Sequence, residues 1–185
     1  MDDLAALARA TDEFRRQLNL VSDDQWHAPT PCGEWDVTAL AQHVSGGNRM
    51  AELLLEGATA EASLDGARTI NGTDLLTTYD ATSAAQITAF AEPGALELVV
   101  HHPALDMPGE MLLMFRTADL ALHGWDLANS IGSDTTIDPD VATSIWVRLE
   151  PIAPLLSGSG MFGQPTGALP DDASPTAKLL HATGR

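Results

Sequence analysis

An apolar run at residues 110–132, EMLLMFRTADLALHGWDLANSIG, constrains the fold of this chain most, because a carboxylate and an imidazole lie within it. Asp119 and His123 are four residues apart, so on a helix their side chains stand one above the other. A charge among such apolar neighbours costs free energy unless it is paired or binds a metal ion. The run therefore predicts a largely buried helix that carries a polar site on one face.

A third candidate, His43, lies in a second apolar segment, TPCGEWDVTALAQHVSGGN at residues 30–48. The helical spacing of the apolar residues in this segment predicts that His43 faces the core. One carboxylate and two imidazoles from two helices would leave positions open on a metal ion, as catalytic sites do. We therefore predict a metal site formed by His43, Asp119 and His123.

The residues alone leave other interpretations open. His43 could be a hydrogen-bonded core histidine, which is the commoner role of a single buried histidine. Asp119 and His123 could form a buried pair without a metal, or belong to a network of surface ion pairs. The apolar side chains around the pair argue against the surface network.

Three neighbouring side chains each have two interpretations. Arg116 could pair with Asp119 at i, i+3, which we favour, or its planar guanidinium could bind the carboxylate of a substrate or thiol. Asp126 could orient a liganding imidazole, or it could accept a hydrogen bond from a helix or loop N-terminus, which we expect. Cys32 precedes the helix of His43, so that helix could acidify its thiol; we expect instead a small buried hydrophobic residue.

Two pairs of consecutive residues, one of glycines and one of histidines, also bear on the predicted metal site. Gly46–Gly47 lowers helix stability relative to alanine, and it predicts either room for a substrate above the metal or close packing of two helices. In an extended segment, the side chains of His101–His102 would point to opposite faces, so they would not readily chelate one ion together.

Composition limits the class of protein. The 185 residues, 44% of them hydrophobic, suit a single domain over residues 1–185, and only 5% are aromatic, which favours helix over sheet. A net charge of −17 makes nucleic-acid and membrane partners improbable. Cys32 is the only cysteine, so a Cys-rich zinc site and an internal disulfide are excluded. The chain has neither a basic leader nor an apolar run of about 18 residues, so we expect a cytoplasmic protein, as a monomer or homodimer.

Hydrophobic periodicity and end signals predict four long helices and two shorter ones. Asp36 and Asp138 are expected N-caps, and Gly132 is an expected helix stop. The expected long helices cover residues 2–20, 36–55, 73–91 and 110–131; a fifth covers 138–150 and a short sixth covers 175–183. We expect a connecting loop over 58–72, one short strand or an extended crossover within 96–109, and a Gly/Pro/Ser-rich excursion over 157–175. Four long helices with unequal connections are typical of a four-helix bundle, in which metal sites come from facing helices.

The segments TPCGEWDVTALAQHVSGGN (30–48) and RTADLALHGWDLANSIG (116–132) resemble a known family. They are similar to the N-terminal metal-binding domain of mycothiol-dependent maleylpyruvate isomerases, and most similar to an uncharacterised actinobacterial branch of that family, within the wider DinB/YfiT-like superfamily. The C-terminal segment FGQPTGALPDDASPTAKLLHATGR also resembles the usual ending of that branch. The resemblance implies an all-α, DinB-like four-helix bundle with additional short helices and one short extended segment.

The resemblance also implies that His43, Asp119 and His123 are the protein ligands of one divalent ion, with water or substrate completing its shell. Zinc fits this ligand set best, and nickel, iron or manganese fit almost as well. The isomerases carry Glu where this chain has Asp119, and the resemblance implies that they also have a C-terminal domain that this chain lacks.

The implied activity is that of a metal-dependent thiol transferase or isomerase with mycothiol as cosubstrate and an electrophilic small molecule as substrate. The alternative is a non-catalytic bundle that binds a metal or small ligand, as a sensor or stress-response protein. The two differ in chemistry: an incomplete protein shell favours catalysis, and the lack of a persuasive general acid or base beyond the ligands favours the alternative.

Overall fold

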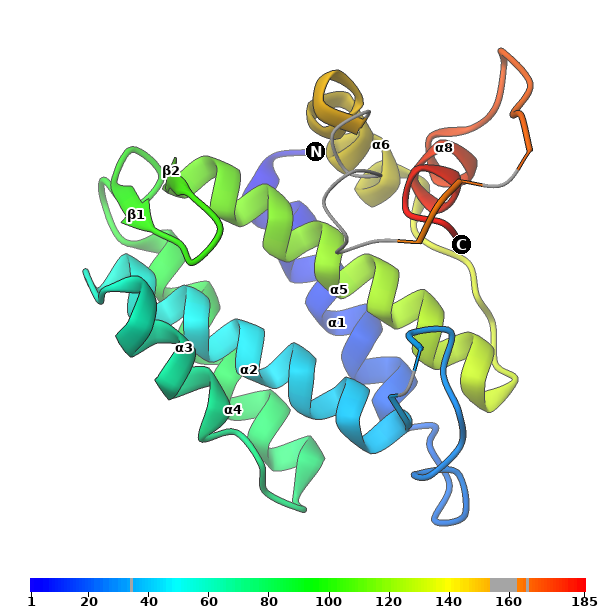
Figure 1. Cartoon of the computed structure of the whole chain (residues 1–185), viewed down its shortest axis with the longest axis horizontal. Coiled ribbons are helices and arrows are strands. Elements are labelled where there is room, and N and C mark those ends of the chain that lie inside the picture. The colour runs from blue at the N-terminus through cyan, green and yellow to red at the C-terminus, as the bar shows by residue number, and fades with distance from the viewer. Residues whose placement is uncertain (34, 154–162, 166) are drawn as a thin grey trace.

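The computed structural model describes residues 1–33, 35–153, 163–165 and 167–185. Four long helices form a bundle, as predicted. They are α1 (Asp3–Leu18), α2 (Val37–Leu55), α4 (Leu75–Ala91) and α5 (Gly109–Ile131). Helix α5 runs along α1, and α2 lies between α5 and α4 (Figure 1). The helices that carry the predicted ligands, α2 and α5, are therefore neighbours.

Aspartate side chains cap the N-termini of three of the long helices, and the cap at Asp36 was predicted. The side chains of Asp2, Asp36 and Asp74 each accept a hydrogen bond from the backbone N–H three residues on, which satisfies a group that has no partner within the helix. Helix α5 ends at Gly132, which adopts a left-handed conformation with φ of 72°. Glycine adopts this conformation without steric cost, which explains the sharp end of α5.

The core lies between the four long helices and is built mainly from leucine, with a few aromatic rings. Phe14 of α1 and Tyr79 of α4 are fully buried, with ring centroids 5.0 Å apart. The Tyr79 hydroxyl donates a hydrogen bond to the carbonyl oxygen of Thr11 over 2.8 Å, so its burial leaves no unpaired polar group. These contacts join α1 to α4.

A short helix, α3 (Ala60–Arg68), replaces part of the loop predicted over 58–72, so that prediction was wrong. Ser63 is the only described residue of α3 that is buried, which is why no apolar periodicity marked the helix. The helix packs on α2 at Gly46, where a Cβ on the glycine would lie 3.2 Å from the carbonyl oxygen of Ala67. For Gly46, the structure therefore favours close helix packing over room for a substrate.

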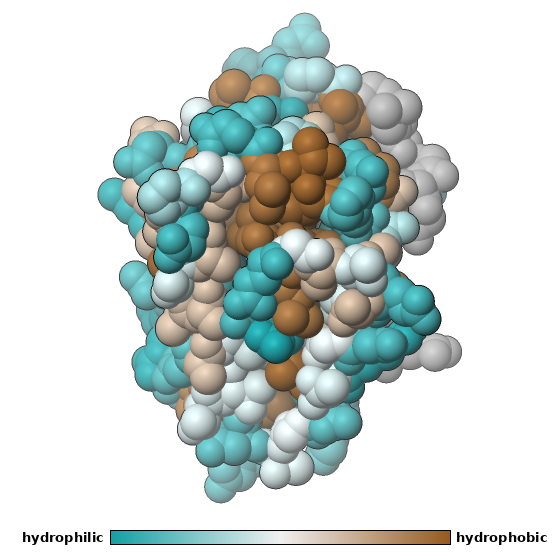
Figure 2. Space-filling view, turned by 90° about the vertical axis from the view of Figure 1, so that its left-hand side faces the viewer, coloured by the Kyte–Doolittle hydropathy of each residue, from teal (hydrophilic) through white to brown (hydrophobic). Residues whose placement is uncertain are grey.

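A two-stranded antiparallel hairpin connects α4 to α5, where one strand or an extended crossover was predicted. It consists of β1 (Val99–His101) and β2 (Asp106–Pro108), with Val100 opposite Met107 and both side chains buried. Leu98, Val99 and Leu105 are exposed large hydrophobic residues in and beside the hairpin. Figure 2, which views the side of the molecule that carries the hairpin, shows hydrophobic surface gathered among polar side chains.

The chain after α5 adds α6 (Pro139–Leu149), the 3-10 turn η1 (Glu150–Ile152) and α8 (Pro175–Ala182). Asp138 caps α6 and Pro139 takes its first position, as predicted. Helix α6 packs on α1, α5 and α8, which brings the end of the chain towards the bundle (Figure 1). Part of the predicted excursion over 157–175 lies outside the described residues. Within the described ranges, no helix has the length and hydrophobicity needed to span a membrane.

Candidate metal centre

The structure brings the three predicted ligands together. His43 extends from α2, and Asp119 and His123 extend from α5. Asp119 Oδ1 lies 3.4 Å from His123 Nε2 and 3.7 Å from His43 Nε2. One ligand atom from each of the three residues lies within 4.8 Å of the others, so the group could hold one metal ion.

The spacing of these donors fits a single divalent cation. Around a tetrahedral zinc ion with bonds of about 2.0–2.1 Å, two nitrogen or oxygen ligands lie about 3.3–3.4 Å apart. The distances from Asp119 Oδ1 to the two imidazoles are close to this value. Two imidazoles and one carboxylate are also a ligand set that zinc and other first-row divalent metals accept.

The site is open on the side of His43. The His43 side chain is 40% exposed, so the prediction that it faces the core was wrong. Helical spacing correctly placed it on the face of α2 that meets α5, but spacing does not say whether a further element covers that position. Trp35 lies beside it, with ring centroids 4.4 Å apart. The Asp119 side chain is 25% exposed and that of His123 only 11%, so access to the site decreases from α2 towards α5.

A buried arginine orients the carboxylate of Asp119, the candidate ligand. The Arg116 guanidinium donates to Asp119 Oδ2 over 2.8 Å, which is the ion pair that the i, i+3 spacing favoured. It also donates to three acceptors on neighbouring helices: Gln86 Oε1, Asn48 Oδ1 and the Val44 carbonyl oxygen. Because Arg116 holds Oδ2, Asp119 presents only Oδ1 to the two imidazoles. A role as anchor for a substrate carboxylate stays a prediction, and the substrate would have to compete with these acceptors.

The charges of the site are coupled. Burial opposes ionisation of Asp119, but the charges of Arg116 and His123 outweigh it and hold the pKa of this carboxyl well below its usual value. Burial also opposes protonation of His123, yet the charge and hydrogen bond of Asp119, with hydrogen bonds to Asp126 and Cys32, raise the pKa of this imidazole well above its usual value. These directions favour an ion pair between a protonated His123 and the Asp119 carboxylate, and a metal ion bound at Nε2 would take the place of that proton.

His123 has a second set of partners on its other ring nitrogen. Its Nδ1 lies 2.9 Å from Oδ2 of Asp126, which is fully buried. The Cys32 thiol donates to the same oxygen over 3.0 Å. Asp126 therefore contacts a ligand imidazole, and the expected hydrogen bond to a helix or loop N-terminus was wrong. Cys32 is half-buried and packs against the core, as expected of a small hydrophobic residue, but its thiol also makes this polar contact.

Arg185, which the sequence did not indicate, completes this second cluster. Its guanidinium donates from Nε to Asp126 Oδ1 over 2.9 Å and from Nη2 to Oδ2 over 2.6 Å. Burial raises the pKa of Asp126, but hydrogen bonds with His123 and Arg185 lower it to about 2. No periodicity or spacing links residue 185 to α5, so pattern analysis had no signal for this contact.

Cys32, His123 and Asp126 form a second group whose geometry could hold a metal ion. The two groups share His123, which faces each of them with a different ring nitrogen. A cation in the second group would have to displace the guanidinium of Arg185 from a fully buried carboxylate. The group of His43, Asp119 and His123 is more accessible and is therefore the better candidate.

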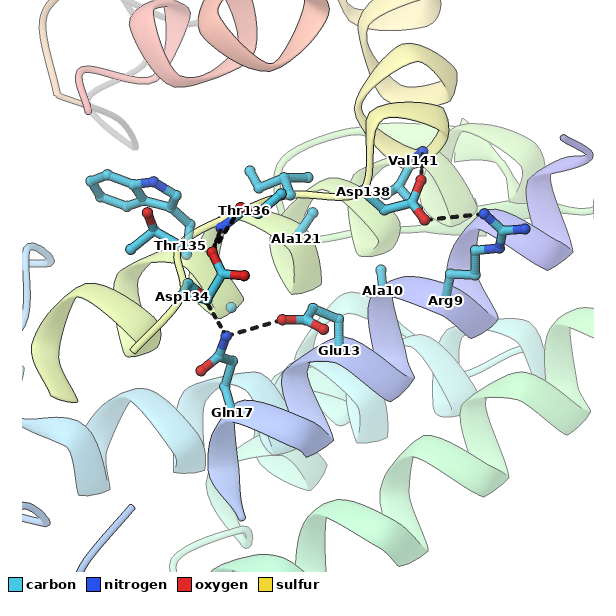
Figure 3. A pocket seen from close by; sticks show the side chains of 13 residues that line it. Arg9, Ala10, Glu13, Gln17, Ala121, Asp134, Thr135, Thr136, Asp138 and Val141 are labelled. Atoms are coloured by element: carbon cyan, nitrogen blue, oxygen red, sulfur yellow. Dashed lines mark hydrogen bonds and ion pairs between the residues drawn. The ribbon is translucent and has the colours of Figure 1, made fainter. Parts of the chain in front are cut away.

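Neither candidate metal group includes any of the other described histidines. His101 Nδ1 pairs with Asp106 Oδ1 across the hairpin, and His27 Nδ1 pairs with Asp36 Oδ2. A small cavity of about 20 Å³ between α1 and residues 134–138 contains none of the candidate ligands. Beside it, Gln17 donates hydrogen bonds to Glu13 Oε1 and to the Asp134 carbonyl oxygen, and Arg9 donates one to Asp138 (Figure 3).

Comparison with known proteins identifies the family. The profile described as the mycothiol maleylpyruvate isomerase N-terminal domain matches residues 7–128. The chain belongs to this family. The matched range includes the three candidate ligands and also Cys32 and Asp126, whereas Arg185 lies outside it.

Two similar proteins of uncharacterised function match the whole chain. Two uncharacterised proteins of Mycobacterium tuberculosis, MT0763 of strain CDC 1551 / Oshkosh and Rv0738 of strain ATCC 25618 / H37Rv, are each 31% identical over 186 residues. Each alignment covers 100% of this chain and 98% of the relative. The predicted resemblance to an uncharacterised actinobacterial branch of the family is thus confirmed.

Solved structures confirm the fold. A mycothiol-dependent maleylpyruvate isomerase superposes with a TM-score of 0.71 at 17% identity, over 99% of this chain and 88% of the isomerase. A histidine-to-alanine mutant of such an isomerase gives 0.72 at 16% identity, over 97% and 87%. Coverage this complete contradicts the expectation that a whole C-terminal domain of the isomerases has no counterpart in this chain.

Proposed function

We propose that this protein is a metal-dependent enzyme that joins a low-molecular-weight thiol of the mycothiol type through its sulfur to an electrophilic small molecule, or uses that thiol to isomerise such a molecule. The observation that carries the proposal is the group of His43, Asp119 and His123. Their three donor atoms lie close together, and one of the three residues, His43, is exposed to solvent. Three protein ligands leave coordination positions for exogenous molecules, whereas closed structural zinc sites use four. The family of the chain agrees with this chemistry.

The chemistry requires a thiolate near neutral pH. A divalent ion with an open position lowers the pKa of a thiol that binds to it, and this makes the nucleophile available. For transfer, the sulfur forms a bond to an electrophilic carbon whose leaving group departs with the electron pair. For isomerisation, the sulfur adds to a conjugated double bond and leaves after rotation, so the thiol is regenerated.

The side chains of the site divide the remaining work. His43 and His123 would hold the ion as neutral imidazoles, and Asp119 would supply one anionic oxygen while Arg116 fixes the other. The Trp35 ring lies against the ring of the exposed His43, so a small molecule that approaches His43 would contact this indole. Zinc fits this donor set best, and nickel, iron or manganese also fit.

A non-catalytic metal-binding role is the second candidate, and a specific observation favours it. Among the described side chains around the ligands, Arg116, Asp126 and Arg185 are all engaged in ion pairs. None of these three is a free acid or base at the open side of the site. A protein that binds a metal or small ligand without turnover would also have ion-paired side chains around the ligands and would need no free acid or base.

The first test is elemental analysis of protein purified without added metal, followed by titration with zinc. The metal-loaded protein is then mixed with mycothiol and one of two electrophiles: maleylpyruvate for isomerisation, or a chlorodinitrobenzene for transfer with loss of chloride. We expect bound metal and thiol-dependent turnover, and we expect His43→Ala to abolish both.

His101→Ala is the matched control, since His101 is also an exposed histidine paired with an aspartate but lies on the hairpin. It should leave metal content and turnover unchanged. Full metal occupancy without thiol binding or turnover would support the non-catalytic role instead. Failure of the wild-type protein to bind any divalent metal would exclude both the proposed enzyme and a non-catalytic metal-binding role.

A further inference from the structure

Asp126 is a fully buried carboxylate that contacts three polar groups from three parts of the chain. Its Oδ2 lies 2.9 Å from His123 Nδ1 on the same helix and accepts a hydrogen bond from the Cys32 thiol over 3.0 Å. Arg185, beyond the end of α8, donates to both oxygens over 2.9 and 2.6 Å. A buried charge requires such compensation, because an unpaired one is strongly destabilising.

The contact between Asp126 and His123 matters for the metal site because the two imidazole nitrogens are coupled. A carboxylate that accepts a proton from Nδ1 fixes the tautomer whose Nε2 carries the lone pair. In this structure Nε2 is the nitrogen that faces Asp119 Oδ1, at 3.4 Å. The position of Asp126 therefore determines whether His123 presents a ligand lone pair to the candidate metal centre.

Arg185 controls the position of Asp126. Its two hydrogen bonds are of the bidentate type, which fixes the plane of a carboxylate as well as its distance. The Arg185 side chain is only 11% exposed, so water competes weakly with this pair. Among the described contacts of Asp126, Arg185 is the only permanently charged partner.

We propose that Arg185 is a positioning residue of the metal centre: it fixes Asp126 as the acceptor for His123 Nδ1, so that His123 Nε2 points at His43 and Asp119. Arg185 itself touches none of the three candidate ligands and acts through Asp126. The inference rests on the metal site of the proposed function. The inference makes metal binding depend on Arg185, which lies outside the range matched by the family profile.

The test compares zinc affinity, measured by competition with a chromophoric chelator, in the wild-type protein, Arg185→Gln and Arg185→Lys. Loss of an outer partner of a metal-bound histidine typically weakens metal binding about 10- to 100-fold, and we expect Arg185→Gln to fall in this range. Arg185→Lys restores the charge but not the bidentate geometry, so it should recover part of the affinity.

Arg15→Gln is the matched control, because Arg15 also forms a bidentate pair, with Asp80, far from the ligands in the sequence and on the exposed surface. It should bind zinc like the wild-type protein. A second readout is the nitrogen NMR spectrum of zinc-loaded protein labelled at histidine. It should show His123 protonated at Nδ1 in the wild-type protein and a mixture of states in Arg185→Gln. A merely structural role would lower stability without changing this signature.

The outcomes distinguish the proposed metal-dependent function from the positioning role of Arg185. If the wild-type protein does not bind zinc or another divalent metal, the proposed function fails. If the wild-type protein binds zinc and Arg185→Gln binds it equally well with the same His123 signature, only the role of Arg185 is overturned.

Discussion

The guanidinium of Arg116 fills the space in which any side chain at Gly47 would begin. A Cβ at residue 47 would clash with Nη1 of Arg116, which is held by acceptors on α2, α4 and α5. Gly47 therefore allows a buried arginine to cross from α5 to α2 and to pair with Asp119. The structure thus gives Gly47 a packing role beneath the candidate metal site.

Substitution of Gly47 should destabilise the protein even though alanine is the better helix former. We expect Gly47→Ala to lower the free energy of unfolding by about 1–3 kcal/mol, the usual cost of overpacking a core. We also expect weaker zinc binding, because Arg116 must shift and release Asp119. Urea denaturation and a zinc titration measure the two effects.

Gly124→Ala is the control for helix propensity. Gly124 lies inside α5, and a Cβ there would meet no atom within 4 Å. This substitution should stabilise the protein by up to about 1 kcal/mol, the difference in helix propensity between the two residues. Equal effects of the two substitutions would contradict the role given to Gly47.

The carboxylate ligand gives a second prediction. Asp119→Asn keeps the shape of the side chain but leaves Arg116 without its counter-charge, so we expect loss of zinc binding and a destabilisation of at most about 3 kcal/mol for this partly exposed pair. Asp119→Glu retains the charge, and it should retain zinc binding, although with altered affinity because the longer chain moves the oxygens. Isothermal titration with zinc distinguishes the two. Retained affinity in Asp119→Asn would show that residue 119 is not a ligand.

The site could be predicted from sequence where local geometry determined it. The i, i+4 spacing of Asp119 and His123 on an apolar helix fixed their relation within α5, and the apolar pattern of residues 30–48 gave His43 as the third candidate before the family resemblance implied the same set. Exposure was harder to predict, because periodicity gives the face of α2 on which His43 lies but not what covers that face.

Contacts between distant segments had no local signal. Arg185 reaches Asp126 only because α8 packs on α6 and α6 on α5, which no spacing in the sequence encodes. The helix α3 was missed for another reason. Its contact with α2 involves small residues such as Gly66 and Ala67, so it has no apolar stripe.

Metal binding should be linked to stability, because an ion that binds only the folded chain stabilises it. At a free zinc concentration of about 100 times the Kd, the expected gain is about 2.7 kcal/mol. For a chain of this size, that corresponds to a rise in Tm of about 5–10 °C. Scanning calorimetry with zinc and with excess chelator measures the shift. His43→Ala should abolish the shift, whereas an unchanged shift in that variant would place the bound zinc elsewhere.

The N-cap of α6 predicts how part of the stability depends on pH. Burial raises the pKa of Asp138, but the backbone N–H groups of Val141 and Asp140 and the Arg9 guanidinium outweigh it and lower the pKa below the usual 3.8 (Figure 3). A lowered folded-state pKa contributes stability that is present above the unfolded value and is lost as the pH falls through the folded value. Asp138→Ala should therefore cost about 1 kcal/mol near neutral pH, as for other N-caps, and progressively less below pH 3.8.

Asp138→Asn separates the charge of this cap from its hydrogen bonds. Asparagine accepts the same backbone hydrogen bonds but does not titrate, so the difference between the Asn and Ala variants should stay constant with pH. The difference between wild type and Asn should shrink in acid, because only the wild-type side chain loses its charge there. Urea denaturation of the three proteins at neutral and acidic pH measures both differences. If the wild-type advantage over Ala persisted unchanged in strong acid, the ionised carboxylate would not be the source of the stabilisation, and Arg9 would contribute nothing through its charge.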